Sequence, residues 1–154
     1  MSLLGKAAPD FTLFNHRKEP VSLAAQRGQR VALLFYPAAF TGVCERELCT
    51  VSSQFAGILG SKAAVYGISV DMPFSNAAFA AKTNATFPLL SDVHRAATRA
   101  YGVSWPNFAG IEGLEVSNRA AFVVDEAGQV VYEWIAANPG VEPDYAAVLA
   151  ALGG

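Results

Sequence analysis

Two cysteines, Cys44 and Cys49, are the residues of this chain best suited to do chemistry, and they stand five residues apart. A continuous apolar run ends at Pro37, and apolar residues spaced by three and four begin near Thr41. If Thr41 is the N-cap of a helix, Cys44 is the third helical residue and lies beside backbone N–H groups that have no partner within the helix. Because a helix N-terminus favours negative charge, Cys44 is a candidate thiolate nucleophile.

The helix start alone is too weak to ionise a thiol fully. A free thiol has a pKa of about 8.5, so only a few per cent is thiolate at neutral pH. A helix N-terminus contributes about 0.3–1 kcal/mol, whereas one pKa unit corresponds to ~1.4 kcal/mol. Glu45 and Glu47 oppose an anion locally, and Arg46 should point elsewhere on the helix. We therefore expect a cation from a distant part of the chain to approach Cys44.

Other interpretations of the cysteines compete with this one. Either could be a small buried apolar residue of an amphipathic helix, and Cys49 follows the apolar Leu48. A zinc site would need Cys44, Cys49, His16 and His94, but their spacing is unlike that of known zinc sites. A C-x-x-C motif is absent, which argues against a disulfide oxidoreductase.

The elements that must position Cys44 follow from hydrophobic periodicity. Buried strands are expected at 31–36, 63–70 and 120–124, the last pairing with 129–134 across a turn at 125–128. The stretch 87–90 is expected to be a short extended piece. Helices are expected at 41–59 before a stop at Gly60, at 75–82 with Ser75 as cap, at 92–101 before Gly102, and at 143–152. The stretch 104–118 reads as irregular. Alternating strands and helices predict an α/β fold, a three-layer sandwich whose sheet is mostly parallel with an antiparallel edge.

Length and composition agree with one domain over residues 1–154. The chain is 53% hydrophobic and 16% charged, with a formal net charge of −2, which excludes a disordered chain and argues against nucleic-acid binding. Two cysteines are too few for a disulfide scaffold. The low charged fraction and the exposed-looking Phe40, Trp105 and Phe108 hint at a homodimer, although a monomer is left open. The alternative expectation is that these aromatics line the pocket of the site or complete the core.

Membrane insertion and export are not expected. The longest apolar run, 31–40, is about half of the ~20 residues that a spanning helix needs, and Pro37 interrupts it. The first residues lack the apolar core of a signal peptide. We expect a cytoplasmic protein, in which a structural disulfide is unusual.

The motif Pro37-x-x-x-Thr41-x-x-Cys44 resembles the active-site motif of the peroxiredoxin family of thiol peroxidases, the AhpC/TSA type. Further stretches resemble landmarks of that family in the same order, at 5–13, 35–37, 67–71, 87–92, 101–103 and 119–128. The resemblance implies a thioredoxin-like fold, a three-layer α/β/α sandwich with a mixed central sheet. It also implies reduction of hydrogen peroxide and organic hydroperoxides without a metal or organic cofactor.

The resemblance also implies residue roles. Cys44 matches the peroxidatic cysteine, which becomes a sulfenic acid. Thr41 matches the residue whose hydroxyl contacts the thiolate and the peroxide, and Pro37 matches the residue that shields the pocket. Arg119 matches the guanidinium that faces the sulfur, and is thus the distant cation expected above.

The fate of the sulfenic acid is left open between two branches. The position of Cys49 resembles the bacterioferritin comigratory protein or peroxiredoxin Q branch, which implies a resolving cysteine, a Cys44–Cys49 disulfide and recycling by thioredoxin. The stretches 132–134 and 138–144 are more similar to the one-Cys alkyl hydroperoxide reductase E branch, which implies that Cys49 is a bystander and that an external, glutaredoxin-like thiol reduces Cys44. A thioredoxin-like redox-sensing module without turnover is a further alternative.

A Cys44–Cys49 disulfide would require a local opening of the helix. On an intact helix, residues five apart face about 140° away from each other with Cα atoms roughly 8–9 Å apart. A disulfide tolerates at most about 7 Å. We therefore predict that the first helical turns unwind before the two sulfurs join, helped by Gly42.

Overall fold

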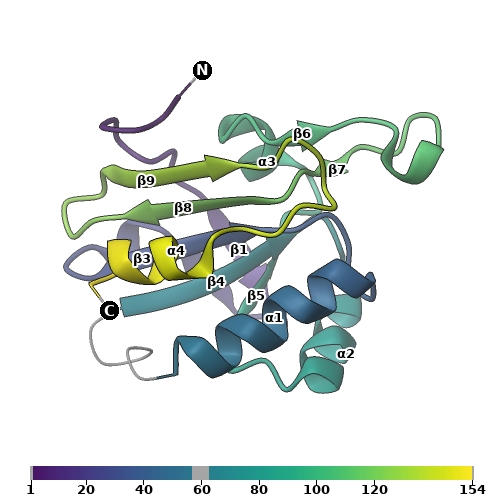
Figure 1. Cartoon of the computed structure of the whole chain (residues 1–154), viewed down its shortest axis with the longest axis horizontal. Helices are drawn as coiled ribbons and strands as arrows, with labels where there is room; N and C mark the ends of the chain where they lie inside the picture. The colour runs from purple at the N-terminus through teal and green to yellow at the C-terminus, as the bar shows by residue number, and fades with distance from the viewer. Residues whose placement is uncertain (1, 57–62, 154) are drawn as a thin grey trace.

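The computed structural model describes residues 2–56 and 63–153, and in them the chain forms one seven-stranded mixed sheet (Figure 1). The spatial order is β2-β1-β5-β4-β3-β8-β9. Its strands are β1 (Thr12–Asn15), β2 (Pro20–Ser22), β3 (Arg30–Phe35), β4 (Ala63–Ser69), β5 (Leu89–Ser91), β8 (Ala120–Val124) and β9 (Val130–Ile135). A separate two-stranded ribbon pairs β6 (Ser104–Trp105) with β7 (Val116–Ser117).

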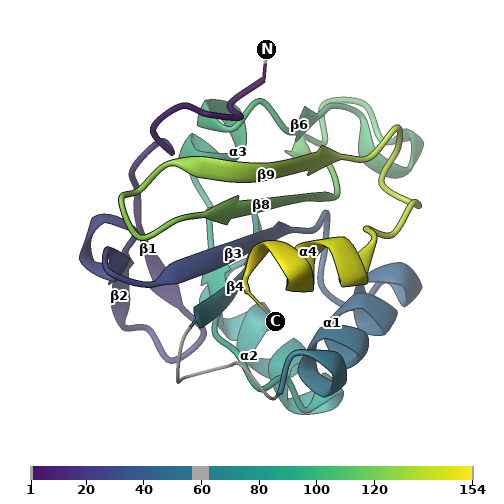
Figure 2. The ribbon, with the colours of Figure 1, turned by 60° about the vertical axis from the view of Figure 1, so that its left-hand side comes forward.

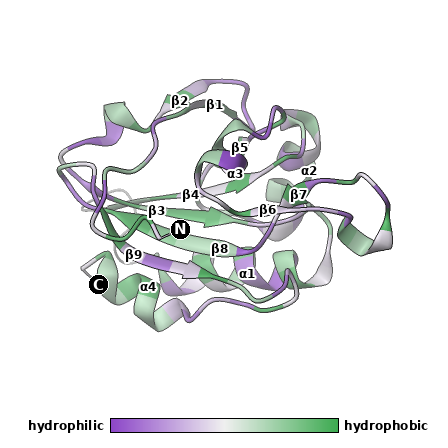
Figure 3. Cartoon of the chain, turned by 90° about the horizontal axis from the view of Figure 1, so that it is seen from above, coloured by the Kyte–Doolittle hydropathy of each residue, from purple (hydrophilic) through white to green (hydrophobic). Residues whose placement is uncertain are grey.

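Helices cover both faces of the sheet. They are α1 (Gly42–Gln54), α2 (Pro73–Thr83), α3 (Ala96–Ala100) and α4 (Tyr145–Ala151), with short 3-10 turns η1 (Ala24–Gln26) and η2 (Phe108–Gly110). One buried cluster joins α1, α2 and α4 to the sheet, and a second joins α3 to its other face. In Figure 2, α4 lies in front of β3, and Figure 3 shows α1 and α4 on one side of the hydrophobic strands and α3 on the other.

The strand sequences explain the two cores. In β3, side chains alternate between the faces, so Ala32 and Leu34 join the α1 side while Val31, Leu33 and Phe35 join the α3 side. Both sets are buried, which is why this strand is apolar from Val31 to Phe35. The predicted thioredoxin-like α/β/α sandwich with a mixed sheet is confirmed.

The expectation of a mostly parallel sheet was wrong. Only the β3–β4 and β4–β5 pairs of the described sheet are parallel, whereas β1–β2, β1–β5, β3–β8 and β8–β9 are antiparallel. Parallel neighbours need long crossovers, and here α1 and α2 provide them. The remaining strands come from an N-terminal pair and from the predicted 120–134 hairpin, which flank the parallel centre.

Several predicted helix ends differ from the structure. α1 begins as expected after Thr41, but it ends at Gln54 with Phe55 as its C-cap. The rest of the predicted helix, 57–59, and the stop at Gly60 lie outside the described residues. α2 begins at Pro73, not at Ser75, because proline suits the first helical position.

The helix predicted at 92–101 is shorter, because Asp92 precedes it and its carboxylate accepts the N–H groups of Ala97 and Thr98. Gly102 ends it with a φ of 70°, as expected. The C-terminal helix, expected from 143, begins after its N-cap Asp144. The stretch 104–118 contains the β6–β7 ribbon and η2, although it was expected to be irregular.

Pairing of β3 with β8 brings two of the candidate site residues, Pro37 and Arg119, to the same end of the sheet. β3 and β8 are antiparallel, and Phe35 at the end of β3 pairs with Ala120 at the start of β8. The chain therefore leaves β3 through Tyr36 and Pro37 at the same edge where Arg119 enters β8. None of the helices in the described parts of the chain is long and apolar enough to cross a membrane.

Candidate active site

Cys44 lies in the first turn of α1, as the third helical residue, and its side chain is fully buried. Thr41 is the N-cap with extended backbone angles, and its carbonyl accepts the N–H of Glu45. The Cys44 side chain belongs to the core cluster that includes Tyr36 and Leu48. The sulfur is thus held beside the free N–H groups of a helix start, in apolar surroundings that exclude water.

The guanidinium of Arg119 reaches this sulfur from far along the chain. Its Nη2 lies 3.1 Å from Cys44 Sγ, its Nη1 donates to Glu47 Oε1 at 2.7 Å, and its Nε donates to the carbonyl of Pro139 at 3.0 Å. Arg119 is only 1% exposed. The structure therefore brings together the cysteine and the distant cation that the sequence predicted.

Glu47 completes a buried charged group that the sequence did not predict. We expected Glu45 and Glu47 to oppose an anion at Cys44. Instead Glu45 pairs with Lys82 at the surface at 2.8 Å, and Glu47 turns inward to Arg119. Glu47 lies three residues after Cys44, on the same face of the helix, and that spacing was the available signal.

The electrostatics of this pair reflect its burial. Burial raises the pKa of Glu47 to about 7, although Arg119 opposes this shift. Its Oε2 has no hydrogen-bond partner among the described residues. Burial lowers the pKa of Arg119, but its contacts with Glu47 and Cys44 raise that pKa on balance, so the guanidinium stays charged.

The remaining predicted residues surround a hollow of about 180 Å³ at the mouth of the site. It is lined by Pro37, Thr41, Gly42, Val43, Phe108, Arg119, Pro139 and Gly140. The Thr41 hydroxyl donates to the carbonyl of Ala38 at 3.0 Å, so it faces the loop and not the helix. The expectation that the aromatics line the pocket fits Phe108, whereas Phe40 is 48% exposed and Trp105 is half-buried.

Cys49 is not brought to Cys44. Cys49 is exposed while Cys44 is buried, and α1 runs unbroken through both. The Cys49 Sγ lies 3.9 Å from the carbonyl of Thr83, on the side of α2.

The residues of the zinc alternative are also kept apart. His16 accepts the N–H of Leu89 through Nδ1, and His94 is exposed on the loop before α3. Among the described residues, no group of three or more His, Cys, Asp or Glu side chains could hold a metal ion.

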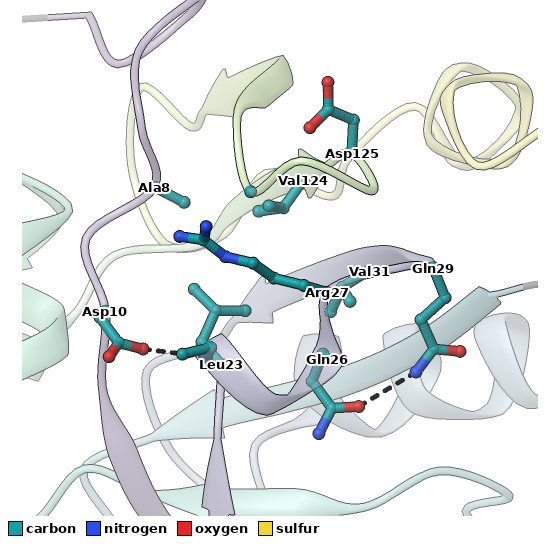
Figure 4. A pocket seen from close by; sticks show the side chains of 11 residues that line it. Ala8, Asp10, Leu23, Gln26, Arg27, Gln29, Val31, Val124 and Asp125 are labelled. Carbon is teal, nitrogen blue, oxygen red and sulfur yellow. Dashed lines mark hydrogen bonds between the residues drawn. The ribbon is translucent and has the colours of Figure 1, made fainter.

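A second hollow lies at the opposite end of β3 and β8 from Arg119 (Figure 4). The side chain of Arg27 extends across it toward Ala8, and Asp10 accepts the N–H of Ala24 at its border. It contains only about 20 Å³ of free space. We regard it as a packing gap because it has room for about one water molecule.

Comparison with known proteins identifies the family. The model of the AhpC/TSA family matches residues 4–133. Alkyl hydroperoxide reductase E of Mycobacterium bovis is 40% identical over 128 residues, covering 81% of this chain and 80% of that protein. Peroxiredoxin Q of Arabidopsis thaliana is 36% identical over 130 residues, covering 83% of this chain and 58% of that chloroplastic protein.

Solved structures agree with this assignment. Peroxidoxin BcpB from Mycobacterium tuberculosis superposes with a TM-score of 0.81 at 27% identity, covering 99% of this chain and 97% of that one. Peroxiredoxin Q of Xanthomonas campestris gives 0.80 at 29% identity, covering 93% and 89%. The chain therefore belongs to the AhpC/TSA family, and it is a peroxiredoxin, an oxidoreductase that reduces peroxides with a cysteine thiol.

Proposed function

We propose that Cys44 is the peroxidatic cysteine and that it acts on hydrogen peroxide and organic hydroperoxides. The Cys44 thiolate attacks the terminal oxygen of ROOH, an S–O bond forms, and the O–O bond breaks. The sulfur is oxidised to sulfenic acid, and the other peroxide oxygen leaves as an alkoxide that takes up a proton to become ROH, or water when R is hydrogen.

Arg119 and the first-turn N–H groups of α1 are the donors proposed for this step, and the Thr41 hydroxyl joins them only by turning away from the Ala38 carbonyl to which it donates. Charge moves from the sulfur to the leaving oxygen, and donors fixed in advance stabilise it most in a site that excludes water. Glu47 and the Pro139 carbonyl hold two edges of the guanidinium, which leaves Nη2 directed at the sulfur. Pro37 is buried and lines the hollow, which supports the proposed role of shielding it.

The observation that carries the proposal is the 3.1 Å contact between Arg119 Nη2 and Cys44 Sγ. The test is peroxide consumption by Cys44→Ser, with Cys49→Ser as the matched control. We expect Cys44→Ser to lose all activity and Cys49→Ser to keep its first turnover. Full activity in Cys44→Ser would reject the assignment.

We propose further that Cys49 resolves the sulfenic acid. The Cys49 thiol attacks the Cys44 sulfur, a disulfide forms, and water leaves; thioredoxin then reduces the disulfide by thiol exchange. Because α1 is continuous between the two cysteines, its first turns must open for this step.

One-Cys catalysis is the second candidate, and the orientation of Cys49 away from Cys44 favours it, as does the similarity to alkyl hydroperoxide reductase E. An external thiol, from a glutaredoxin-like protein, would then reduce Cys44. Mass spectrometry after one equivalent of peroxide separates the two. Loss of two hydrogens within one chain indicates the disulfide, whereas a persistent gain of one oxygen indicates one-Cys catalysis.

Four points about the whole protein remain predictions. A single domain over residues 1–154, a cytoplasmic location, the choice between monomer and homodimer, and the nature of the reductant are expectations from the sequence. Sedimentation of the reduced protein measures the oligomeric state. An NADPH-coupled assay with thioredoxin or glutaredoxin identifies the reductant.

A further inference from the structure

The loop between β3 and α1 contains a strained residue next to the active site. Phe40 has a φ of 65°, a left-handed conformation that bulky residues rarely adopt. Its ring lies 5.3 Å from that of Phe79 and 5.7 Å from the ammonium group of Lys82, and it is half exposed. Such a conformation persists only where surrounding contacts fix it.

Asp71 provides the contact that fixes this loop. Its Oδ2 accepts the N–H of Ala39 at 2.8 Å, directly before the strained residue, and also accepts the Ser69 hydroxyl at 2.8 Å. Asp71 follows β4, so a carboxylate at the end of the neighbouring parallel strand holds the backbone of the active-site loop.

A buried network fixes Asp71 and the base of the loop together. The Tyr36 hydroxyl donates to Asn76 Oδ1 at 2.7 Å, and Asn76 Nδ2 donates to the hydroxyls of Ser69 at 3.3 Å and Ser91 at 3.1 Å. Ser69 has one hydroxyl proton, and the short contact directs it to Asp71. The hydrogen bonds thus run in one direction, from Tyr36 through Asn76 and Ser69 to Asp71.

The network therefore holds the loop at two points, the Tyr36 side chain at its start and the Ala39 N–H near its end. Only the strained Phe40 and the N-cap Thr41 lie between Ala39 and the start of α1. If Ala39 is released, Phe40 can relax, and the first turn of α1 with Cys44 is no longer held under Arg119.

We propose that Asp71 is a positioning residue that keeps the first turn of α1 folded and thereby sets the balance between two forms of the site. In the folded form Cys44 faces Arg119 and reacts with peroxide. In the opened form Cys44 can meet Cys49. This inference rests on the proposed function, in which the folded turn favours oxidation and the opened turn favours the disulfide.

The test compares Asp71→Ala with the conservative variant Asp71→Asn, using rapid mixing to follow peroxide reduction and quenched mass spectrometry to follow the disulfide. A hydrogen bond to a charged group contributes roughly one order of magnitude to an equilibrium. A shift of the balance is divided between the two forms, so we expect Asp71→Ala to slow the reaction with peroxide and to speed disulfide formation by factors whose product is about ten. Asp71→Asn should lie between, because its amide oxygen can still accept both hydrogen bonds.

Asp125→Asn is the matched control, because Asp125 Oδ1 accepts the N–H groups of Ala127 and Gln129 in the distant hairpin turn. It should leave both rates unchanged. If Asp71→Ala changes both rates in the same direction, or changes neither, the proposal is wrong.

Hydrogen exchange separates failure of the anchor from failure of the proposed function. In the reduced protein, the N–H groups of residues 39–45 should exchange at least several-fold faster in Asp71→Ala, while those of β3 stay unchanged. If the N–H groups of residues 39–45 exchange at the wild-type rate in Asp71→Ala, Asp71 does not anchor the loop, even if Cys44 is confirmed as the nucleophile. Faster exchange supports it even if Cys49 proves to be a bystander.

Discussion

At the scale of single residues, the guanidinium of Arg119 organises the site. It contacts a sulfur, a carboxylate and a backbone carbonyl at once, and its planar fork of donors is what allows this. Removing it would also leave Glu47 buried without its counter-charge. A residue with one point charge cannot replace these contacts.

Arg119→Lys should therefore slow the reaction of reduced protein with peroxide by about 10²–10³-fold, the usual effect of removing one donor from a charge-stabilising site. Stopped-flow mixing with hydrogen peroxide measures this rate. Arg30→Lys is the control, because Arg30 makes a surface pair with Glu126. A near-normal rate in Arg119→Lys would mean that a positive charge alone, without the several donors of the guanidinium, supports the reaction with peroxide.

The buried carboxylate of Glu47 should make stability depend on pH. Its pKa is raised in the folded protein, from 4.5 to about 7, so between these values the folded state holds a proton that the unfolded state has lost. The contribution is fully present below pH 4.5 and is lost as the pH rises through 7. The free energy of unfolding should thus fall over this range, by at most about 3 kcal/mol.

Denaturant unfolding of wild type and Glu47→Gln at pH 5 and pH 8 measures the effect. The free energy of unfolding should fall less with rising pH in Glu47→Gln than in wild type, because the amide does not titrate. Glu45→Gln, which alters only the surface pair with Lys82, should behave like wild type. An equal change in the free energy of unfolding between pH 5 and pH 8 in wild type and Glu47→Gln would contradict the prediction.

At the scale of elements, α1 serves two opposing needs. Its first turn must be folded to place Cys44 beside the helix N-terminus and Arg119. The same turn must open if Cys49 is to reach Cys44. Gly42, the first helical residue, weakens that turn because glycine loses more backbone entropy on folding than any other residue.

Gly42→Ala should slow the opening. A methyl group there would meet only Arg46 Nη1 at 3.8 Å, so it fits without strain. Alanine favours a helix by roughly 0.5–1 kcal/mol over glycine, which predicts disulfide formation about two- to fivefold slower. Quenched mass spectrometry measures this rate, and the rate of the first reaction with peroxide should stay as in wild type.

The same substitution in a Cys49→Ser background provides the control. Without a resolving thiol, Gly42→Ala should leave the lifetime of the sulfenic acid unchanged. If the alanine slows the first oxidation instead, then opening of the turn is part of peroxide reduction itself.

At the scale of the whole molecule, the site depends on how tightly the sheet packs beneath it. Gly67 of β4 lies where Leu89, Tyr36 and Phe87 converge. A methyl group there would stand 2.8 Å from Leu89 Cδ2 and 3.1 Å from Tyr36 Cε1. Glycine is required at this position by close packing of β4 against its neighbours and not by a turn.

Gly67→Ala should therefore lower the free energy of unfolding by about 1–3 kcal/mol, the usual cost of overpacking a core. Chemical denaturation measures the loss. Gly42→Ala, the same chemical change in open space, should not destabilise the protein. If Gly67→Ala is as stable as wild type, the Leu89 side chain can move away from the added methyl group without loss of stability.

The sequence by itself predicted most of the elements and the candidate reactive cysteine. Continuous apolar strands, the start of a helix after Thr41 and the motif ending at Cys44 depend on local periodicity and capping, which neighbouring residues decide. The position of Arg119 was predictable only through the family resemblance. The starts of α2 and α3 were less well predicted, because Pro73 and Asp92 set them through local capping that competes with periodicity.

Only the tertiary structure decided the electrostatics of the site. That Glu47 turns inward while Glu45 turns to the surface depends on which face of α1 packs on the sheet, and tertiary packing sets that face. The anchoring of the loop by Asp71 likewise requires two parallel strands to end side by side. Hydrogen bonds between residues 32 or 72 positions apart leave no local pattern, because folding alone brings such groups together.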